Sequence, residues 1–148
     1  MTAEEESSFE TAYYNREDWK GRFIGETKDY EYHLYRKKFG CKKAVKLAKL
    51  YVCGMGAFEC WINGERVSDH VMEPGWTDFR KTCFYTAYDV TEYFAEGENI
   101  ENIILVKLGD CMFNVPGGRY VYFQRSYGKA KFLCQLELVY EDDRTGIV

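Results

Sequence analysis

Proline, histidine and long apolar stretches are scarce in this sequence. Proline and histidine each occur only twice among 148 residues. With two histidines, the sequence offers few candidates for a catalytic base of the histidine type. No apolar stretch approaches the roughly 20 residues that a membrane-spanning helix needs. The acidic beginning also lacks the basic and then apolar order of a secretory signal peptide. We therefore expect a soluble, cytoplasmic protein without a membrane partner.

An excess of positive charge is also missing. The 20 Lys and Arg residues are outnumbered by 24 Asp and Glu residues, so the formal net charge is −4. Proteins that bind nucleic acid use Lys and Arg to neutralise phosphates, so this balance argues against a nucleic-acid partner. Aromatic side chains, in contrast, make up 18% of the chain, far too many for a disordered segment.

The six cysteines lack the spacing of a structural metal site. No two of them form a C-x-x-C pair, and no secretory signal places them in an oxidising compartment. We expect reduced thiols that are mostly buried as small apolar side chains. The cysteines are Cys41, Cys53, Cys60, Cys83, Cys111 and Cys134.

Apolar and polar residues alternate with a period of two, which is typical of half-buried strands. The pattern is clearest at residues 132–140 and 57–62, and Asn63-Gly64 after the second run predicts a tight hairpin. Further strands are expected at residues 32–39, 45–53, 82–88 and 102–108, with one helical turn at 89–95. We predict an all-β, antiparallel β-sandwich over residues 19–148, preceded by a flexible N-terminal arm at residues 1–18.

Two long segments do not fit strands, His70–Lys81 and Gly109–Lys131. Long segments of this kind are often functional. Both combine aromatic rings, which pack on sugar faces, with polar groups that can bind sugar hydroxyls. The candidate carbohydrate-binding residues are Trp76, Asp78, Arg80, Asp110, Tyr120 and Tyr122. The alternative is that these aromatic residues cover a neighbouring domain.

Catalytic and metal-binding motifs are weak. Asp69, Glu73, Asp78 and Asp110 lie in loop-like segments, and paired carboxylates across a cleft can hydrolyse glycosidic bonds. Acidic residues in loops are ordinary in an acidic protein, so we assign no catalytic residue. Loop carboxylates can also bind calcium, but no regular ligand spacing is present.

The middle of the chain resembles a known family. Residues 62–78 read INGERVSDHVMEPGWTD and residues 85–91 read YTAYDVT. These runs, with the strands that flank them, closely resemble the N-terminal domain of bacterial α-L-rhamnosidases of glycoside hydrolase family 78. The resemblance covers nearly the whole chain from Trp19 onward.

The resemblance implies a jelly-roll sandwich similar to galactose-binding domains, packed beside an (α/α)6 catalytic barrel. The catalytic acids of the family lie in that barrel, and nothing in this chain corresponds to it. The resemblance therefore implies a non-catalytic accessory domain, with the catalytic domain of the same parent enzyme as partner. It also implies a role in the recognition of rhamnosylated glycans.

Two alternatives stay open. Some related modules bind L-rhamnose with the help of calcium, so this chain could be an independent carbohydrate-binding module with a weak, calcium-assisted rhamnose site. Asp29 is then the nearest candidate metal ligand. The second alternative is a stand-alone glycosidase that uses the loop carboxylates.

Overall fold

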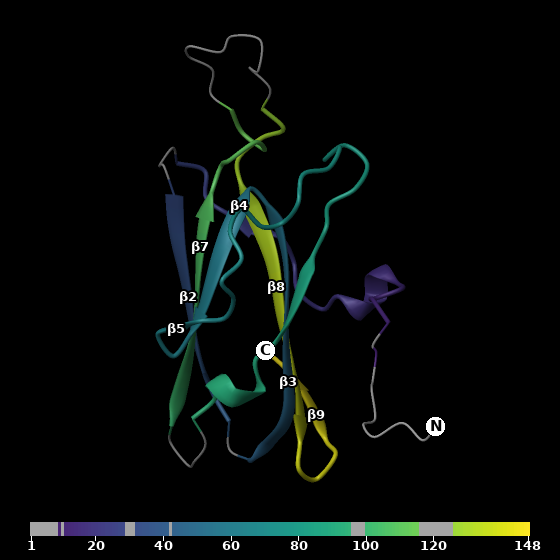
Figure 1. The fold of residues 1–148 in the computed structure, drawn as a ribbon, viewed down its shortest axis with the longest axis vertical. Coiled ribbons are helices and arrows are strands. Elements are labelled where there is room, and N and C mark those ends of the chain that lie inside the picture. The colour runs from purple at the N-terminus through teal and green to yellow at the C-terminus, as the bar shows by residue number, and fades with distance from the viewer. Residues whose placement is uncertain (1–8, 10, 29–31, 42, 96–99, 116–125) are drawn as a thin grey trace, which may run out of the picture.

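The structure, a computed structural model, describes residues 9, 11–28, 32–41, 43–95, 100–115 and 126–148. Its strands form two antiparallel sheets that face each other, one of five strands and one of four (Figure 1). The larger sheet has the order β1 (Ile24–Gly25), β8 (Lys131–Tyr140), β3 (Val45–Met55) and β6 (Thr86–Asp89), with β9 (Thr145–Ile147) also paired to β8. The smaller sheet has the order β2 (Tyr32–Gly40), β7 (Glu101–Gly109), β4 (Ala57–Ile62) and β5 (Glu65–Arg66). The predicted all-β antiparallel sandwich is confirmed.

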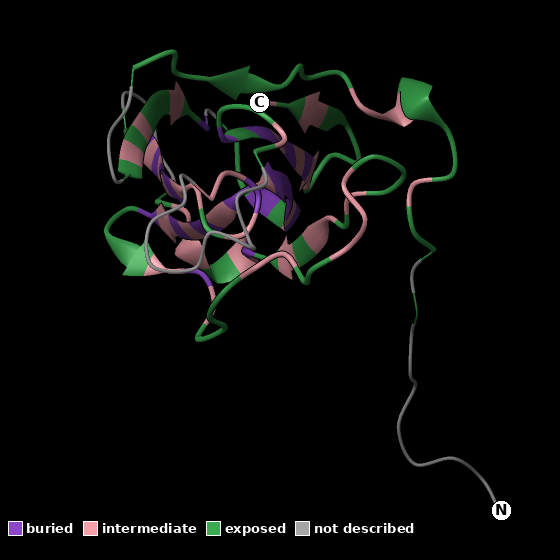
Figure 2. Cartoon of the chain, turned by 90° about the horizontal axis from the view of Figure 1, so that it is seen from above, coloured by how far each residue is buried: buried purple, intermediate pink, exposed green. Residues whose placement is uncertain are grey.

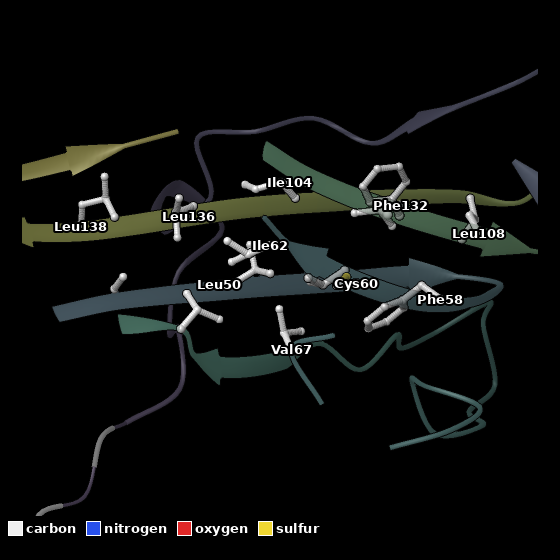
Figure 3. Close-up of a cluster of buried hydrophobic side chains, with 14 of the residues drawn as sticks. Leu50, Phe58, Cys60, Ile62, Val67, Ile104, Leu108, Phe132, Leu136 and Leu138 are labelled. Carbon is white, nitrogen blue, oxygen red and sulfur yellow. The ribbon is translucent and has the colours of Figure 1, made fainter. Parts of the chain in front are cut away.

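The core lies between the two sheets. Alternate residues of each strand point inward, as β4 illustrates with buried Phe58, Cys60 and Ile62. Figure 2 shows the buried residues gathered between the layers, and Figure 3 shows the aliphatic side chains of both sheets meeting there. Leu50 from β3 and Leu136 from β8 are fully buried in this contact. Burial of apolar surface in this layer is the main stabilising contribution.

The predicted hairpin connects β4 to β5. Asn63 and Gly64 have φ angles of 52° and 91°, the left-handed values that a tight two-residue turn requires. Farther along the chain, the strand expected at residues 82–88 is shorter than predicted, because β6 begins only at Thr86. The expected helical turn is the 3-10 helix η2 (Thr91–Tyr93). No helix among the described residues is long and apolar enough to cross a membrane.

The outer face of the larger sheet is covered by a segment from far earlier in the chain. Gln135 points to this outer face, yet it is only 1% exposed. Its Oε1 accepts a hydrogen bond from the backbone N–H of Lys20 at 2.6 Å, and its Nε2 donates to the carbonyl of Asp18 at 3.1 Å. Part of the predicted arm thus contacts the sheet, including the 3-10 helix η1 (Arg16–Asp18). The division of the chain at residue 18 stays a prediction.

Asn102 is the second fully buried polar residue of the described chain, and it joins three segments. Its Oδ1 accepts hydrogen bonds from Asn63 Nδ2 at 2.7 Å and from the backbone N–H of Ala95 at 3.0 Å. Its Nδ2 donates to the carbonyl of Ala95 at 3.1 Å. Asn63 in turn accepts from the N–H of Ile103 at 2.9 Å. The side-chain amides therefore tie the β4–β5 hairpin and the segment after η2 to the start of β7.

We predict that Asn102→Leu lowers the free energy of unfolding by about 1–3 kcal/mol, because leucine leaves the polar groups of Ala95 and Asn63 without their partner. Equilibrium urea denaturation measures this difference. The control is Glu101→Gln, which changes only an exposed ion pair with Lys38 and should stay within about 0.5 kcal/mol of the parent. Equal stability of both variants would show that Asn102 does not organise this end of the sandwich.

All six cysteines are free thiols, as expected, but they differ in burial. Cys41, Cys53 and Cys60 are buried, Cys83 and Cys134 are partly buried, and Cys111 is exposed. Cys111 lies in the turn after β7, with a φ of 44°. Cys134 packs against the core, and burial raises its pKa from the ordinary value of 9.0 to about 12, although nearby Lys37 lowers it. Burial also raises the pKa of Cys60.

We predict that stability falls as the pH rises above 9. The unfolded chain loses the Cys134 proton near pH 9, while the folded chain keeps it up to about pH 12. Each such group costs about 1.4 kcal/mol of stability per pH unit within this window. Urea denaturation of the reduced protein at increasing pH measures the slope, and Cys134→Ala should flatten it. Exposed Cys111→Ala is the control, and identical slopes for both variants would contradict the assignment.

Candidate functional site

The two long segments singled out in the sequence meet at one end of the sandwich. One connects β5 to β6 and the other connects β7 to β8, and Figure 1 shows both at the same end of the sheets. Phe79 from the first segment packs edge-on against Phe113 from the second, with ring centroids 5.2 Å apart. Phe79 also contacts Tyr127 at 5.7 Å, and Tyr127 stacks on Phe113. The sequence had not singled out this ring cluster, because the contact joins residues far apart in the chain.

An apolar surface lies beside this ring cluster. Val71, Met72 and Trp76 have exposed fractions of 70%, 71% and 65%, and we call these three residues the end patch. Met72 and Trp76 also line a small pocket of about 130 Å³ that contains no charged side chain. The remaining lining residues are Gly56, Ala57, Pro74, Phe79, Cys111, Met112 and Phe113. This surface has the composition of a contact site for another apolar surface.

Polar contacts fix the loop that carries the end patch. The carboxylate of Glu73 contacts His70 Nδ1 at 2.8 Å through Oε1 and accepts a hydrogen bond from the hydroxyl of Tyr88 through Oε2. The carbonyl of Glu73 accepts from the N–H of Phe58 in β4 at 2.9 Å. Arg66 donates to the carbonyl of His70 at 2.9 Å. The end patch is therefore presented by a loop that is attached to both sheets.

Trp76, Asp78 and Arg80 lie in the same loop, as predicted, but the two charged residues bind each other. Arg80 Nε and Nη2 donate to the two carboxylate oxygens of Asp78 at 2.8 and 3.1 Å. This pairing raises the pKa of Arg80. The carbonyl of Asp78 also accepts from the N–H groups of Lys81 and Thr82, so Asp78 holds the turn. Trp76, two residues before Asp78 in the chain, is 65% exposed.

Asp110 has a similar local role in the second segment. Its Oδ2 accepts a hydrogen bond from Asn114 Nδ2 at 2.8 Å, and its carbonyl accepts from the N–H of Phe113 at 3.1 Å. The predicted residues Tyr120, Tyr122 and Asp29 lie outside the described residues. Within the described part of the chain, no group of three or more His, Cys, Asp or Glu side chains is arranged to hold a metal ion.

Comparison with known proteins agrees with this fold. Residues 43–148 match the family described as the α-L-rhamnosidase N-terminal domain. The chain belongs to this family. An α-L-rhamnosidase of Formosa agariphila is 31% identical over 150 aligned residues, which cover 91% of this chain and 16% of the relative. An α-L-rhamnosidase of Streptomyces avermitilis is 40% identical over 101 residues, which cover 68% of this chain and 9% of the relative.

Solved α-L-rhamnosidases contain the same sandwich. The enzyme from Dictyoglumus thermophilum superposes with a TM-score of 0.73 and 31% identity, over 90% of this chain and 16% of that one. The enzyme from Aspergillus terreus superposes with a TM-score of 0.78 and 28% identity, again over 90% of this chain and 16% of that one. This rhamnosidase N-terminal domain therefore spans 16% or less of the length of these relatives.

Proposed function

We propose that this rhamnosidase N-terminal domain is a non-catalytic accessory domain that packs on the catalytic part of an α-L-rhamnosidase through its end patch. The family and the small share of each relative that the chain covers support an accessory role. Three of the four loop carboxylates predicted as possible acids have structural uses. Glu73 attaches the end-patch loop, whereas Asp78 and Asp110 hold turns.

The exposed apolar end patch is the observation that carries this proposal. Val71, Met72 and Trp76 keep about two thirds or more of their surface exposed, although the hydrogen bonds of Glu73 and Arg66 hold their loop in place. Leaving three large apolar side chains in water on an ordered loop has a cost that contact with a partner removes. The adjoining uncharged pocket can accept an apolar side chain of that partner.

A contribution to recognition of rhamnosylated glycans follows from the position of Trp76. Trp76 is exposed in the same loop as the Asp78–Arg80 pair, so a sugar can pack on its ring while the sugar hydroxyls reach polar groups of that loop. An accessory domain that packs on the catalytic part at this end would place these groups beside the glycan that the enzyme holds. The end patch is thus proposed as a contact surface whose rim touches the substrate.

We predict that the chain binds the Formosa agariphila relative from which the region matching this chain has been removed. Isothermal titration calorimetry measures the binding, after circular dichroism has shown that the shortened enzyme is folded. Trp76→Ser combined with Met72→Ser should weaken the affinity at least about tenfold, because the exposed apolar area of the end patch is lost. Leu34→Ser is the control, since Leu34 is 58% exposed on β2 of the smaller sheet.

An equal loss of affinity in the Leu34→Ser control would show that non-specific apolar contact, and not the end patch, drives the association. Absence of binding by the parent chain to the folded, shortened enzyme would overturn the proposed packing.

We predict that the chain alone does not hydrolyse p-nitrophenyl α-L-rhamnopyranoside and gives no heat when titrated with L-rhamnose, with or without calcium. Release of p-nitrophenol is followed by absorbance, with an intact α-L-rhamnosidase as the positive control. Hydrolysis that survives repurification would overturn the accessory role. Heat that appears only with calcium would instead favour an independent rhamnose-binding module.

A further inference from the structure

A larger concave surface lies on the outer face of the five-stranded sheet. It is a cleft of about 770 Å³ between the N-terminal segment and residues 81–85, and it shares no lining residue with the pocket of the end patch. Its volume falls within the range of about 300–1,000 Å³ that is usual for small-molecule sites. The lining residues are Tyr13, Tyr14, Asn15, Arg16, Trp19, Gly21, Arg22, Phe23, Cys53, Met55, Lys81, Thr82, Cys83, Tyr85 and Leu133. We call it the outer cleft.

Aromatic contacts fix the wall of the outer cleft. Tyr13 stacks on Tyr51 of β3 with ring centroids 4.4 Å apart, and Trp19 packs edge-on against Tyr13 at 5.0 Å. Trp19 also packs edge-on against Tyr85 at 5.3 Å, and the N–H of Tyr13 donates to the Tyr85 hydroxyl at 2.7 Å. The hydroxyl of Tyr13 donates to Glu137 Oε1 at 2.6 Å. These contacts, together with those of Gln135, form the cleft before any ligand arrives.

The charge of the outer cleft is opposite to that of the whole chain. Arg16, Arg22 and Lys81 line it, and none of its lining residues is Asp or Glu, although the chain carries 24 acidic residues and a net charge of −4. All three cations are exposed, and within the described residues none of them forms an ion pair. A fourth cation, Lys131, lies 5.9 Å from the ring centroid of Phe23 at the edge of the cleft. Cations that have no ion-pair partner in the described part of the chain and surround one concavity favour an anionic ligand.

Aromatic rings in the same cleft favour a ligand with an apolar face. Trp19 and Tyr85 are partly exposed, and Phe23 is 41% exposed. A pyranose packs its C–H face on such rings while its substituents reach the surrounding polar groups. Stacked bases of a single-stranded nucleic acid also bind aromatic rings and cations, but the net negative charge of the chain opposes a polyphosphate partner. The cleft chemistry therefore fits an acidic sugar better than a nucleic acid.

We propose that the outer cleft binds an anionic carbohydrate, a pyranose that carries a carboxylate or a sulfate. The ring stacks on Trp19 and Tyr85, and the acidic group pairs with Arg16, Arg22 and Lys81. The inference rests on the proposed function only for the class of ligand, since a carbohydrate is what a rhamnosidase domain encounters. The site itself is separate from the end patch and from Trp76, so its test is independent of docking.

The test is a titration of the full chain with three tetrasaccharides. Calorimetry and tryptophan fluorescence measure the binding. Tetragalacturonate supplies carboxylates, a sulfated galactose tetrasaccharide supplies sulfates, and cellotetraose is the neutral comparison. The proposal predicts that at least one anionic probe binds at least about tenfold more tightly than cellotetraose, with an affinity that falls as salt is added. The two anionic probes distinguish a uronic acid from a sulfated sugar.

Variants assign the binding to the outer cleft. Arg16→Gln combined with Arg22→Gln should lower the affinity for the anionic probe at least about tenfold. Both side chains are exposed, so the fold should survive, and circular dichroism verifies this. The matched control is Arg36→Gln, an exposed arginine on β2 of the opposite sheet, which should leave the affinity unchanged. The double variant should still bind the shortened rhamnosidase, so a failure of docking and a failure of the cleft remain distinguishable.

Four outcomes would overturn the proposal. One is equal affinity for cellotetraose and the anionic probes, and another is no binding of either anionic probe at millimolar concentration. The third is tighter binding of a short oligothymidylate than of both anionic sugars, which would assign the outer cleft to single-stranded nucleic acid. Equal loss of affinity in the Arg36 control would likewise remove the outer cleft as the site.

Discussion

The apolar contact between the two sheets is the constraint on which the rest of this domain depends. Leu50 and Leu136 of the larger sheet and Ile62 and Leu108 of the smaller one belong to one core cluster, and all four side chains are fully buried. Inward-facing positions of the central strands are therefore committed to stability, and a polar catalytic group there would be costly. Recognition is left to the loops at the end of the sandwich and to the outer faces of the sheets. Both proposed surfaces lie in those places.

Two buried polar side chains connect segments outside the strands to the two sheets. Asn102 holds the hairpin of β4 and β5 and the segment after η2, whereas Gln135 holds the N-terminal segment on the larger sheet. Each satisfies backbone groups that have no strand partner. A buried amide is costly unless it is fully hydrogen-bonded, so these contacts also specify one position for each segment. The outer cleft exists because Gln135 and the stacked rings hold Tyr13 and Trp19 in place.

Local patterns were sufficient for most of the fold. Alternation located the strands at residues 57–62 and 132–140 to within one residue, and the left-handed turn at Asn63-Gly64 followed from its residue types. Alternation within residues 132–140 could not show that a segment 115 residues earlier covers the outer face of this strand at Gln135. Contacts of such separation leave no periodic signal, so the outer cleft and the Phe79–Phe113 contact were not predictable from spacing.

The candidate site, too, was predictable only where neighbouring residues in the sequence determine the structure. Residue type correctly marked the loop of Trp76 as unusual, because a Pro-Gly turn with an indole does not fit a strand. Residue type did not show that Asp78 and Arg80 satisfy each other, which depends on the turn between them. Their mutual pairing weakens them as free ligands for sugar hydroxyls and leaves the apolar end patch as the stronger feature of that loop. The cations of the outer cleft, in contrast, have no such partner among the described residues. A cation without an ion-pair partner in the described structure is therefore better evidence of a ligand than a charge that the sequence merely places near an aromatic ring.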